Sequence, residues 1–447
     1  MPPIYSKRVL CFPVSSNSTE HKDYIVQSLF TALQYTVEEL PFLAGSVVPF
    51  SNEQPWLNDL RAQGAAYLEV KDFSQEIKFE DLRKARFSSS ILDTEKLCPF
   101  PKAIYRQDDP IDVCRLRANF VDGGLLLVIS VIHVVCDGRG ISDVLKIFAD
   151  KLRKLQETEL AGTSNGHKGT SEKPYTFDRA SVLSGKGVPG TIENHKAWTV
   201  LPLAVQDSYT HSKTLCTTFH ISSDSLRSLK RVASSPDQST SISTHDSITA
   251  LIWRSIMLAR HRAGIISEQT ITRCGTFVDS RSRLDLPSPY FGNAIYSVFA
   301  SVAFPALESS TNSIDTSPLS GLQAAALAIR ADINDATGEK VRDLFGFIDR
   351  TSLKHPTRLT LLDDLSVSSI IITSYFGFEM HELDFGEALG GRMEAFRLPS
   401  EGLVPGVPVI LPRLSDGRCE FVISETEDVR KFLLEDEIFR RFASKLC

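Results

Sequence analysis

A histidine and an aspartate four positions apart follow the most apolar stretch of the chain. Residues 125–133 read Leu-Leu-Leu-Val-Ile-Ser-Val-Ile-His, and Val-Val-Cys-Asp-Gly-Arg-Gly comes next. A neutral histidine, with an ordinary pKa of roughly 6.5, can take a proton from a hydroxyl near neutral pH. His133 is therefore a candidate general base, and Asp137 is its candidate carboxylate partner.

The aspartate has two possible roles in this pattern. Asp137 can hold the imidazole in one tautomer, or it can turn away and fix the loop through an arginine. The G-x-S-x-G match Gly162-Thr163-Ser164-Asn165-Gly166 lies in a polar segment and follows no apolar strand, as a nucleophile elbow would, and the chain has no cysteine nucleophile motif. We therefore favour the loop-fixing role. A purely structural alternative for His133, a core histidine bonded by a backbone carbonyl, stays open.

Strongly apolar elements must position this pair. The run 125–133 predicts a rigid strand covered on both faces, with His133 as its last residue. Gly138 and Gly140 allow a sharp turn, and helical spacing from Ile141 to Leu152 predicts a helix that packs back on the strand. The periodicity also predicts helices over 22–40, 245–261 and 321–334, strands over 47–50, 113–121, 214–221, 271–278 and 368–373, and polar surface segments over 160–205 and 309–319.

Length and composition limit the class of protein. A chain of 447 residues is too long for one core, so two domains are expected. The formal net charge of −6 favours neither nucleic acid nor an anionic membrane. The eight cysteines form no C-x-x-C pair and no metal-ligand spacing, and no signal peptide or membrane span is evident. We expect a cytoplasmic protein with reduced thiols and no metal.

Five motifs in order resemble the BAHD-type acyltransferases, in particular the fungal branch that includes trichothecene acetyltransferases. They extend across almost the whole chain: Leu43-Ala44-Gly45; His133-x-x-x-Asp137-Gly138; Ser243-Thr244-x-x-x-Ile248-x-Ala250-x-x-Trp253-Arg254; Val278-Asp279-Ser280-Arg281-Ser282-Arg283-Leu284 with Tyr290-Phe291-Gly292-Asn293; and Leu383-Asp384-Phe385-Gly386. The last motif departs from the family pattern, because Glu387 stands where tryptophan is usual.

The resemblance implies an α/β fold of two chloramphenicol-acetyltransferase-like domains, each a mixed sheet flanked by helices, with the active-site channel at their interface. The implied boundaries are residues 1–190 for the N-terminal domain, 191–210 for the crossover linker and 211–447 for the C-terminal domain. The C-terminal domain would carry the motifs around Arg281, Asn293 and Asp384.

The resemblance also implies the chemistry. His133 would be the general base of an O-acyltransferase that moves an acyl group, acetyl by default, from acyl-CoA to a hydroxyl of a small secondary metabolite. Asp137 would pair with Arg281 to support the loop, and Asp384 and Gly386 would be structural. Ser243, Thr244 and Asn293 are candidate contacts for the CoA cosubstrate, with helix capping and turn formation as the alternatives.

Two related reactions remain possible at this stage. One is a free-standing condensation-type enzyme that uses a carrier-bound acyl donor. Such enzymes normally have a second histidine directly before the first, where this chain has Ile132. The other is an N-acyltransferase on the same fold. We expect a monomer with no permanently bound cofactor and no nucleic-acid or membrane partner.

Overall fold

The structure is a computed structural model, and it describes most of the chain. The described residues are 4–16, 18–51, 54–61, 67–100, 110–160, 182, 192–201, 214–234, 240–286, 290–308, 319–352, 354–400 and 404–447. Much of the predicted segment 160–205, part of the linker 191–210 and most of the predicted loop 309–319 lie outside these residues.

The chain forms two compact units. Unit 1 comprises Met1–Asp178, Leu286–Ala294 and Phe378–Gly402, and unit 2 comprises Arg179–Asp285, Ile295–Gly377 and Leu403–Cys447. Unit 1 thus includes two late segments, around Asn293 and Asp384, that the linear boundaries assign to the C-terminal domain. Contacts with residues far away in the chain group these two segments with unit 1. The predicted boundaries and the channel between the domains stay predictions.

A five-stranded mixed sheet forms the centre of unit 1. Its strands lie in the order β14 (Ala395–Arg397), β1 (Tyr5–Pro13), β7 (Gly124–Ile132), β6 (Cys114–Val121) and β4 (Leu68–Asp72). All neighbours are antiparallel except β4 and β6. The remaining elements of unit 1 are a small sheet of β3 (Gln54–Arg61), β2 (Ser46–Ser51) and β5 (Ile111–Asp112), and helices α1 (Thr19–Glu39), α2 (Phe79–Lys84), α3 (Thr94–Leu97) and α4 (Gly138–Leu160).

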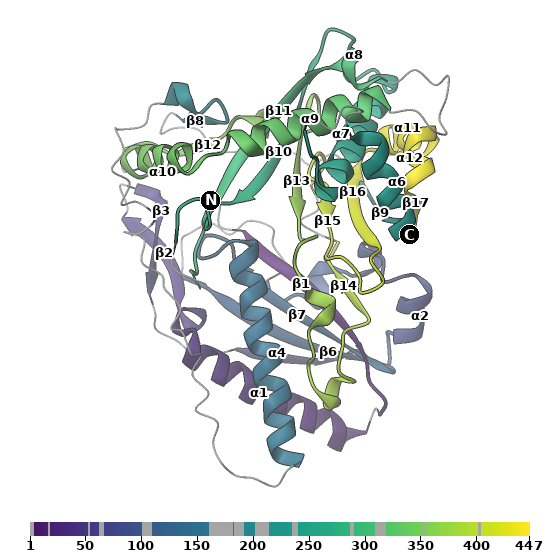
Figure 1. Cartoon of the computed structure of the whole chain (residues 1–447). Helices are drawn as coiled ribbons and strands as arrows, with labels where there is room; N and C mark the ends of the chain where they lie inside the picture. Colours follow the sequence, from purple (N-terminus) through teal and green to yellow (C-terminus); the bar gives the residue numbers. More distant parts are fainter. Residues whose placement is uncertain are drawn as a thin grey trace. The chain divides into compact units, whose positions relative to one another are not determined.

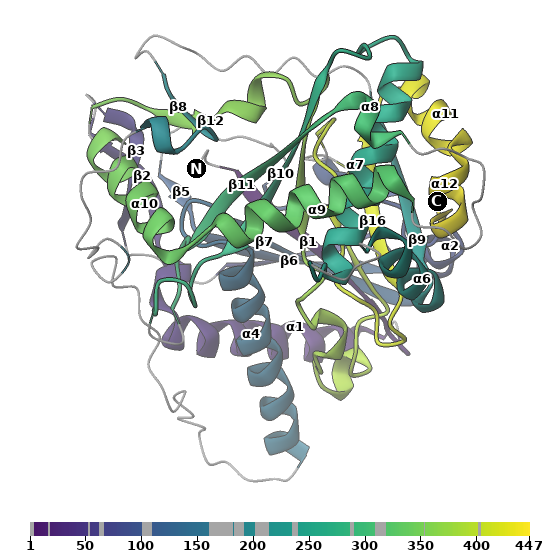
Figure 2. The same cartoon turned by 45° about the horizontal axis from the view of Figure 1, so that its top comes forward.

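Strand β7 is the central strand of this sheet, and every residue in it is buried. Helices α1 and α4 contact each other and lie on one side of the sheet (Figures 1 and 2). Leu126 and Val128 point to the opposite face, where they pack in one cluster with Phe79 and Leu82 of α2. The prediction of a strand covered on both faces is confirmed, and the coverage explains why its residues are apolar without alternation.

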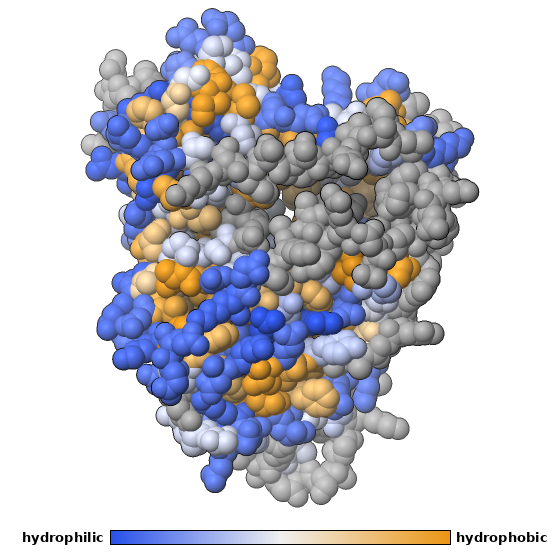
Figure 3. All heavy atoms as spheres, turned by 180° about the vertical axis from the view of Figure 1, so that it is seen from behind, coloured by the Kyte–Doolittle hydropathy of each residue, from blue (hydrophilic) through white to orange (hydrophobic). Residues whose placement is uncertain are grey.

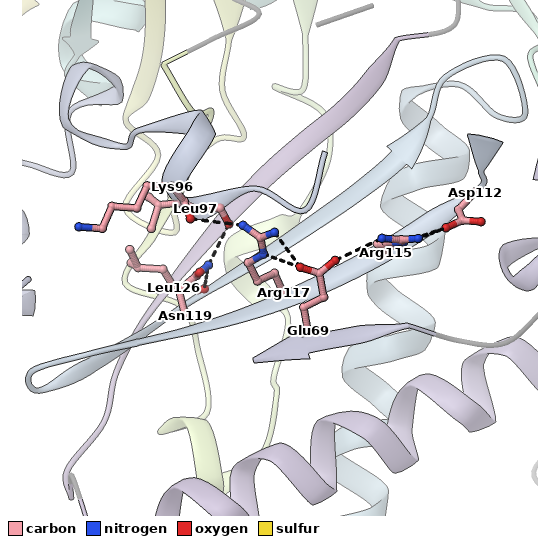
Figure 4. Close-up of polar contacts among 8 residues, drawn as sticks. All are labelled: Glu69, Lys96, Leu97, Asp112, Arg115, Arg117, Asn119 and Leu126. Carbon is pink, nitrogen blue, oxygen red and sulfur yellow. Dashed lines mark hydrogen bonds and ion pairs between the residues drawn. The ribbon is translucent and has the colours of Figure 1, made fainter. Parts of the chain in front are cut away.

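A polar network covers the outer strands of the same sheet (Figure 4). Glu69 of β4 accepts hydrogen bonds from Arg117 of β6 at 2.7 and 2.9 Å, and Arg115 pairs with Asp112. Asn119 of β6 is fully buried and its Nδ2 donates to the carbonyls of Leu97 and Leu126, both at 3.1 Å. The bond from Asn119 to Leu97 connects this part of the sheet to the last residue of α3.

Unit 2 has its own mixed sheet and helical layer. The seven strands lie in the order β11 (Ile295–Ala303), β10 (Ile271–Asp279), β13 (Ser369–Ser374), β15 (Val409–Ile410), β16 (Cys419–Glu425), β9 (Leu215–Ile221) and β17 (Ser444–Lys445). A continuous apolar core joins strands β9, β10, β13 and β16 to the helices α6 (Ser223–Ala233), α7 (Thr244–Arg262), α9 (Ser320–Asp335), α11 (Glu427–Glu435) and α12 (Glu437–Phe442). The other elements are α8 (Phe304–Leu307), α10 (Gly338–Ser352), and a two-stranded sheet of β8 (Trp198–Val200) and β12 (Thr357–Leu359).

Most predicted elements within the described residues are present with small shifts at their ends. The clearest difference concerns His133, because β7 ends at Ile132 and the histidine is the first residue of the turn. The first strand, β1, was not predicted, since Ser6, Lys7 and Arg8 interrupt its apolar pattern; Lys7 and Arg8 are nevertheless buried.

The face of the molecule in Figure 3 and the cysteine side chains have ordinary properties. Apolar side chains occur in small groups among hydrophilic ones on the face in Figure 3, as is usual for proteins. All eight cysteines are in the reduced thiol form, and all except Cys216 and Cys447 are buried. Among the described residues, no helix combines the length and apolar character that crossing a membrane requires.

We expect Leu126→Ala to lower the free energy of unfolding by about 2–5 kcal/mol, because the truncation leaves a cavity between the central strand and α2. The half-exposed Val70 of β4 provides the control, and Val70→Ala should change stability by less than about 0.5 kcal/mol. Urea unfolding of both variants measures the difference. Equal effects would show that β7 is not the core strand of unit 1.

Candidate active site

The histidine turn lies between the end of β7 and the start of α4. The backbone N–H of His133 donates to the carbonyl of Ile4 at 2.8 Å, which extends the pairing of β1 and β7 by one residue. The amide Nδ2 of Asn293 donates to the carbonyls of His133 and Val134, both at 3.0 Å. Both peptide groups of His133 are therefore fixed by hydrogen bonds.

The carboxylate of Asp137 organises the same turn. Its Oδ1 accepts from the N–H of Gly140 at 3.0 Å, and its Oδ2 accepts from the N–H of Ala294 at 2.9 Å. The side chain is buried, with 1% exposure, so these bonds replace the water that the charge has lost. The first bond satisfies a free N–H group in the first turn of α4, and the second attaches the turn to the segment 290–294.

The imidazole is partly exposed, but its Nδ1 is buried and no other described residue bonds to it. Burial lowers the pKa of His133 below its ordinary value, and the positive charge of Arg8 lowers it further. The carbonyl of His133 itself and the charge of Asp137 act in the opposite direction. The net effect favours the neutral ring at neutral pH, which is the form that accepts a proton.

Two predicted residues of unit 2 have local partners. Arg281 forms an ion pair with Asp279 at 3.0 Å, in the turn that follows β10. Ser243 is the N-cap of α7 and forms a capping box with Asp246, as the alternative interpretation expected. Thr244 is the first residue of that helix. The pairing of Asp137 with Arg281 and the CoA contacts of Ser243 and Thr244 stay predictions.

The loop around Asp384 lies at the other end of the unit 1 sheet. Asp384 Oδ1 accepts from the N–H of Gly386 at 2.9 Å, and Gly386 has a φ of +81°. The side-chain amide of Gln156, near the end of α4, donates to Phe385 O at 3.1 Å and accepts from Ala388 N at 2.8 Å. The architectural role of Asp384 and Gly386 stays a prediction.

This loop is far from the histidine. The ring of Phe385 packs edge-on against Phe12, close to the end of β1 that pairs with Gly124, whereas Tyr5 at the other end pairs with Ile132. Eight residue steps of a strand span roughly 26 Å. Glu387, which departs from the family pattern, is an exposed residue of this distant loop.

The sequence predicts Asn293 as a contact for the CoA cosubstrate, and that contact stays a prediction. Its amide bonds to the histidine turn, and the carbonyls concerned lie 160 and 159 residues earlier in the chain. The roles of Gln156, Ala294 and Arg8 were not predicted. Backbone N–H groups and single polar residues in helices have no local pattern that would reveal such partners.

Comparisons with known proteins place the chain in a family. A family model described as the Transferase family matches residues 1–388. The chain belongs to this family, and the resemblance to BAHD-type acyltransferases is confirmed.

Several of the similar proteins are fungal. The chain is 46% identical to claC of Penicillium crustosum, named an enoyl-CoA isomerase/hydratase, over 99% of this chain and 50% of that protein. It therefore spans half the length of that relative. It is 24% identical to the eremophilane O-acetyltransferase prx11 of Penicillium rubens, over 99% of this chain and 96% of that protein. The crystal structure of F. sporotrichioides TRI101 with coenzyme A and T-2 has a TM-score of 0.82 at 23% identity, covering 100% and 96% of the two chains, which confirms the α/β fold.

We predict that the His133 imidazole titrates below about 6.5, the ordinary histidine value. Arg8→Met should raise the pKa of His133, because it removes a nearby positive charge, and Asp137→Asn should lower it, because it removes a negative charge. NMR titration of the histidine C2–H signals measures both shifts, with His133→Gln to assign the signal. Shifts of the same sign in both variants would contradict this electrostatic account.

We predict that Gly386→Ala lowers the melting temperature more than substitution of Glu387 by alanine. An added Cβ at position 386 would lie 2.5 Å from Gln156 Oε1 and would require an unfavourable positive φ. Thermal unfolding of the two variants tests this. If both are as stable as the wild type, the loop does not depend on its contact with α4.

Proposed function

We propose that the chain is an O-acyltransferase that moves an acyl group, acetyl by default, from acyl-CoA to a hydroxyl of a small secondary metabolite.

 The observation that carries this proposal is the position of His133 in a turn that the carboxylate of Asp137 fixes through two backbone N–H groups, with the pKa of the imidazole lowered by burial. The family membership and the O-acetyltransferase names of relatives such as prx11 agree with it.

The reaction needs one base and no covalent intermediate. His133 takes the proton from the acceptor hydroxyl as the oxygen attacks the thioester carbonyl, which gives a tetrahedral oxyanion. The oxyanion collapses, the carbon–sulfur bond breaks, and the imidazolium returns its proton to the departing CoA thiolate. Holding both substrates against the same residue supplies much of the rate enhancement.

In the proposed mechanism Asp137 does not relay a proton. Its oxygens accept from two backbone N–H groups, and its effect on the ring is that of a nearby charge. Loss of this carboxylate would release the start of α4 and the segment 290–294 together. Asp137 is therefore a positioning residue in the proposed mechanism.

We do not propose enoyl-CoA isomerase or hydratase activity for this chain, although claC is named for it. This chain matches only half of that protein, and the family model that it matches is one for transferases. The proposal includes acetyl-CoA as the default cosubstrate, contacts to it from Ser243, Thr244 and Asn293, and a cytoplasmic monomer, as the sequence predicts.

We predict that His133→Ala abolishes acyl transfer while the protein still folds. Purified protein is incubated with acetyl-CoA and a panel of hydroxylated metabolites, and the release of CoA thiol and the mass of the product are measured. The rate should fall at least about 10²-fold, since a positioned general base contributes about 10²- to 10⁴-fold. Circular dichroism and thermal unfolding provide the control for folding.

Parallel reactions separate the alternatives. Amine acceptors test N-acyl transfer, and acyl donors bound to a carrier protein test condensation-type activity. Full activity of His133→Ala with any donor would overturn the mechanism. Turnover only with a carrier-bound donor would overturn the assignment of CoA as the cosubstrate.

A further inference from the structure

The amide of Asn293 is bonded to the histidine turn through two carbonyl groups. Its Nδ2 lies 3.0 Å from the carbonyl oxygen of His133 and 3.0 Å from that of Val134. Its Oδ1 is buried and has no hydrogen-bond partner among the described residues. The reverse orientation of the amide would place its oxygen against two acceptors, so only the observed one is chemically consistent.

The first of these carbonyls belongs to the residue that carries the imidazole. Nδ1 of the ring is buried and has no hydrogen-bond partner among the described residues.

 The position of the ring therefore depends on the backbone of His133, which hydrogen bonds hold at its N–H and at its carbonyl.

Hydrogen bonds on both sides of His133 hold its backbone in place. Ile4 O accepts from the N–H of His133, and Asn293 donates to its carbonyl, so rotation about both backbone bonds of the residue is restricted. Ala294, next to Asn293, donates to Asp137 and keeps the asparagine in place. One short segment thus fixes both the histidine and the carboxylate of the turn.

We propose that Asn293 is a positioning residue for the proposed reaction: it fixes the backbone of His133 and Val134, and through it the position of the His133 imidazole. This inference rests on the proposed function, and it gives Asn293 a role through His133 in addition to the predicted contact with the cosubstrate. Without the amide, the His133 carbonyl and the ring would adopt several orientations, of which few place the base correctly.

The chain contains a matched control. Asn119 makes the same pair of bonds, from one Nδ2 to two backbone carbonyls at 3.1 Å, and it lies in the same unit (Figure 4). Its carbonyl partners belong to Leu97 and Leu126, which are not part of the histidine turn. Asn119 is fully buried, so its loss should cost at least as much stability as the loss of Asn293.

The experiment compares Asn293→Ala, Asn293→Asp and Asn119→Ala with the wild type. We expect kcat of Asn293→Ala to fall about 10- to 100-fold with KM for acetyl-CoA within about threefold, as expected for a misplaced base. Asn293→Asp keeps the shape but replaces the donor by an acceptor, so it should not restore activity. Asn119→Ala should lower the melting temperature and keep kcat within about twofold.

A second measurement does not depend on the substrate. The ring nitrogen signals of His133 in protein labelled with ¹⁵N-histidine report its tautomer and pKa, and His133→Gln assigns them. They should shift in both Asn293 variants and stay unchanged in Asn119→Ala. If the wild type shows no acyl transfer, the proposed function fails and these signals alone decide the role of Asn293.

Two results would overturn the inference. One is wild-type kcat and unchanged ring signals in Asn293→Ala or Asn293→Asp. The other is an equal loss of kcat in Asn119→Ala, which would show that activity follows general stability instead of the histidine turn.

Discussion

The buried carboxylate of Asp137 accepts two backbone hydrogen bonds, and the candidate site depends on them. One bond satisfies the N–H of Gly140 at the start of α4, and the other holds Ala294. A buried charge without such partners would cost several kcal/mol, so the turn and the segment 290–294 must form together. The carboxylate of Asp137 therefore stabilises both the start of α4 and the histidine turn.

The base itself is held through its backbone. The strand β7 ends one residue before His133, and Ile4 and Asn293 bond to the two peptide groups of the histidine. Within the described residues, no side chain bonds to Nδ1 of the ring. Burial lowers the pKa of the ring, so the same packing that orients the base also keeps it unprotonated near neutral pH.

Elements with a strong apolar period could be predicted from the sequence. The helices α1, α4, α7 and α9 have such a signal, because burial against a neighbour requires it. The strand β7 was predictable from its continuous apolar run, and the turn from the spacing of His133, Asp137 and Gly138. Strand β1 could not be predicted, since the buried Lys7 and Arg8 break its pattern. The grouping of 286–294 and 378–402 with unit 1 arises from contacts between residues far apart in the chain, for which one sequence contains no signal.

The buried thiols affect how the protein responds to thiol reagents. Burial raises the pKa of Cys11 and of Cys114 to about 12, and it also raises those of Cys274 and Cys419. Because the thiolate is the reactive form, these side chains should remain inert towards disulfide reagents in the folded state. Only Cys216 and Cys447 are partly exposed. A colorimetric reagent should therefore report a liberated small-molecule thiol with little background from the polypeptide.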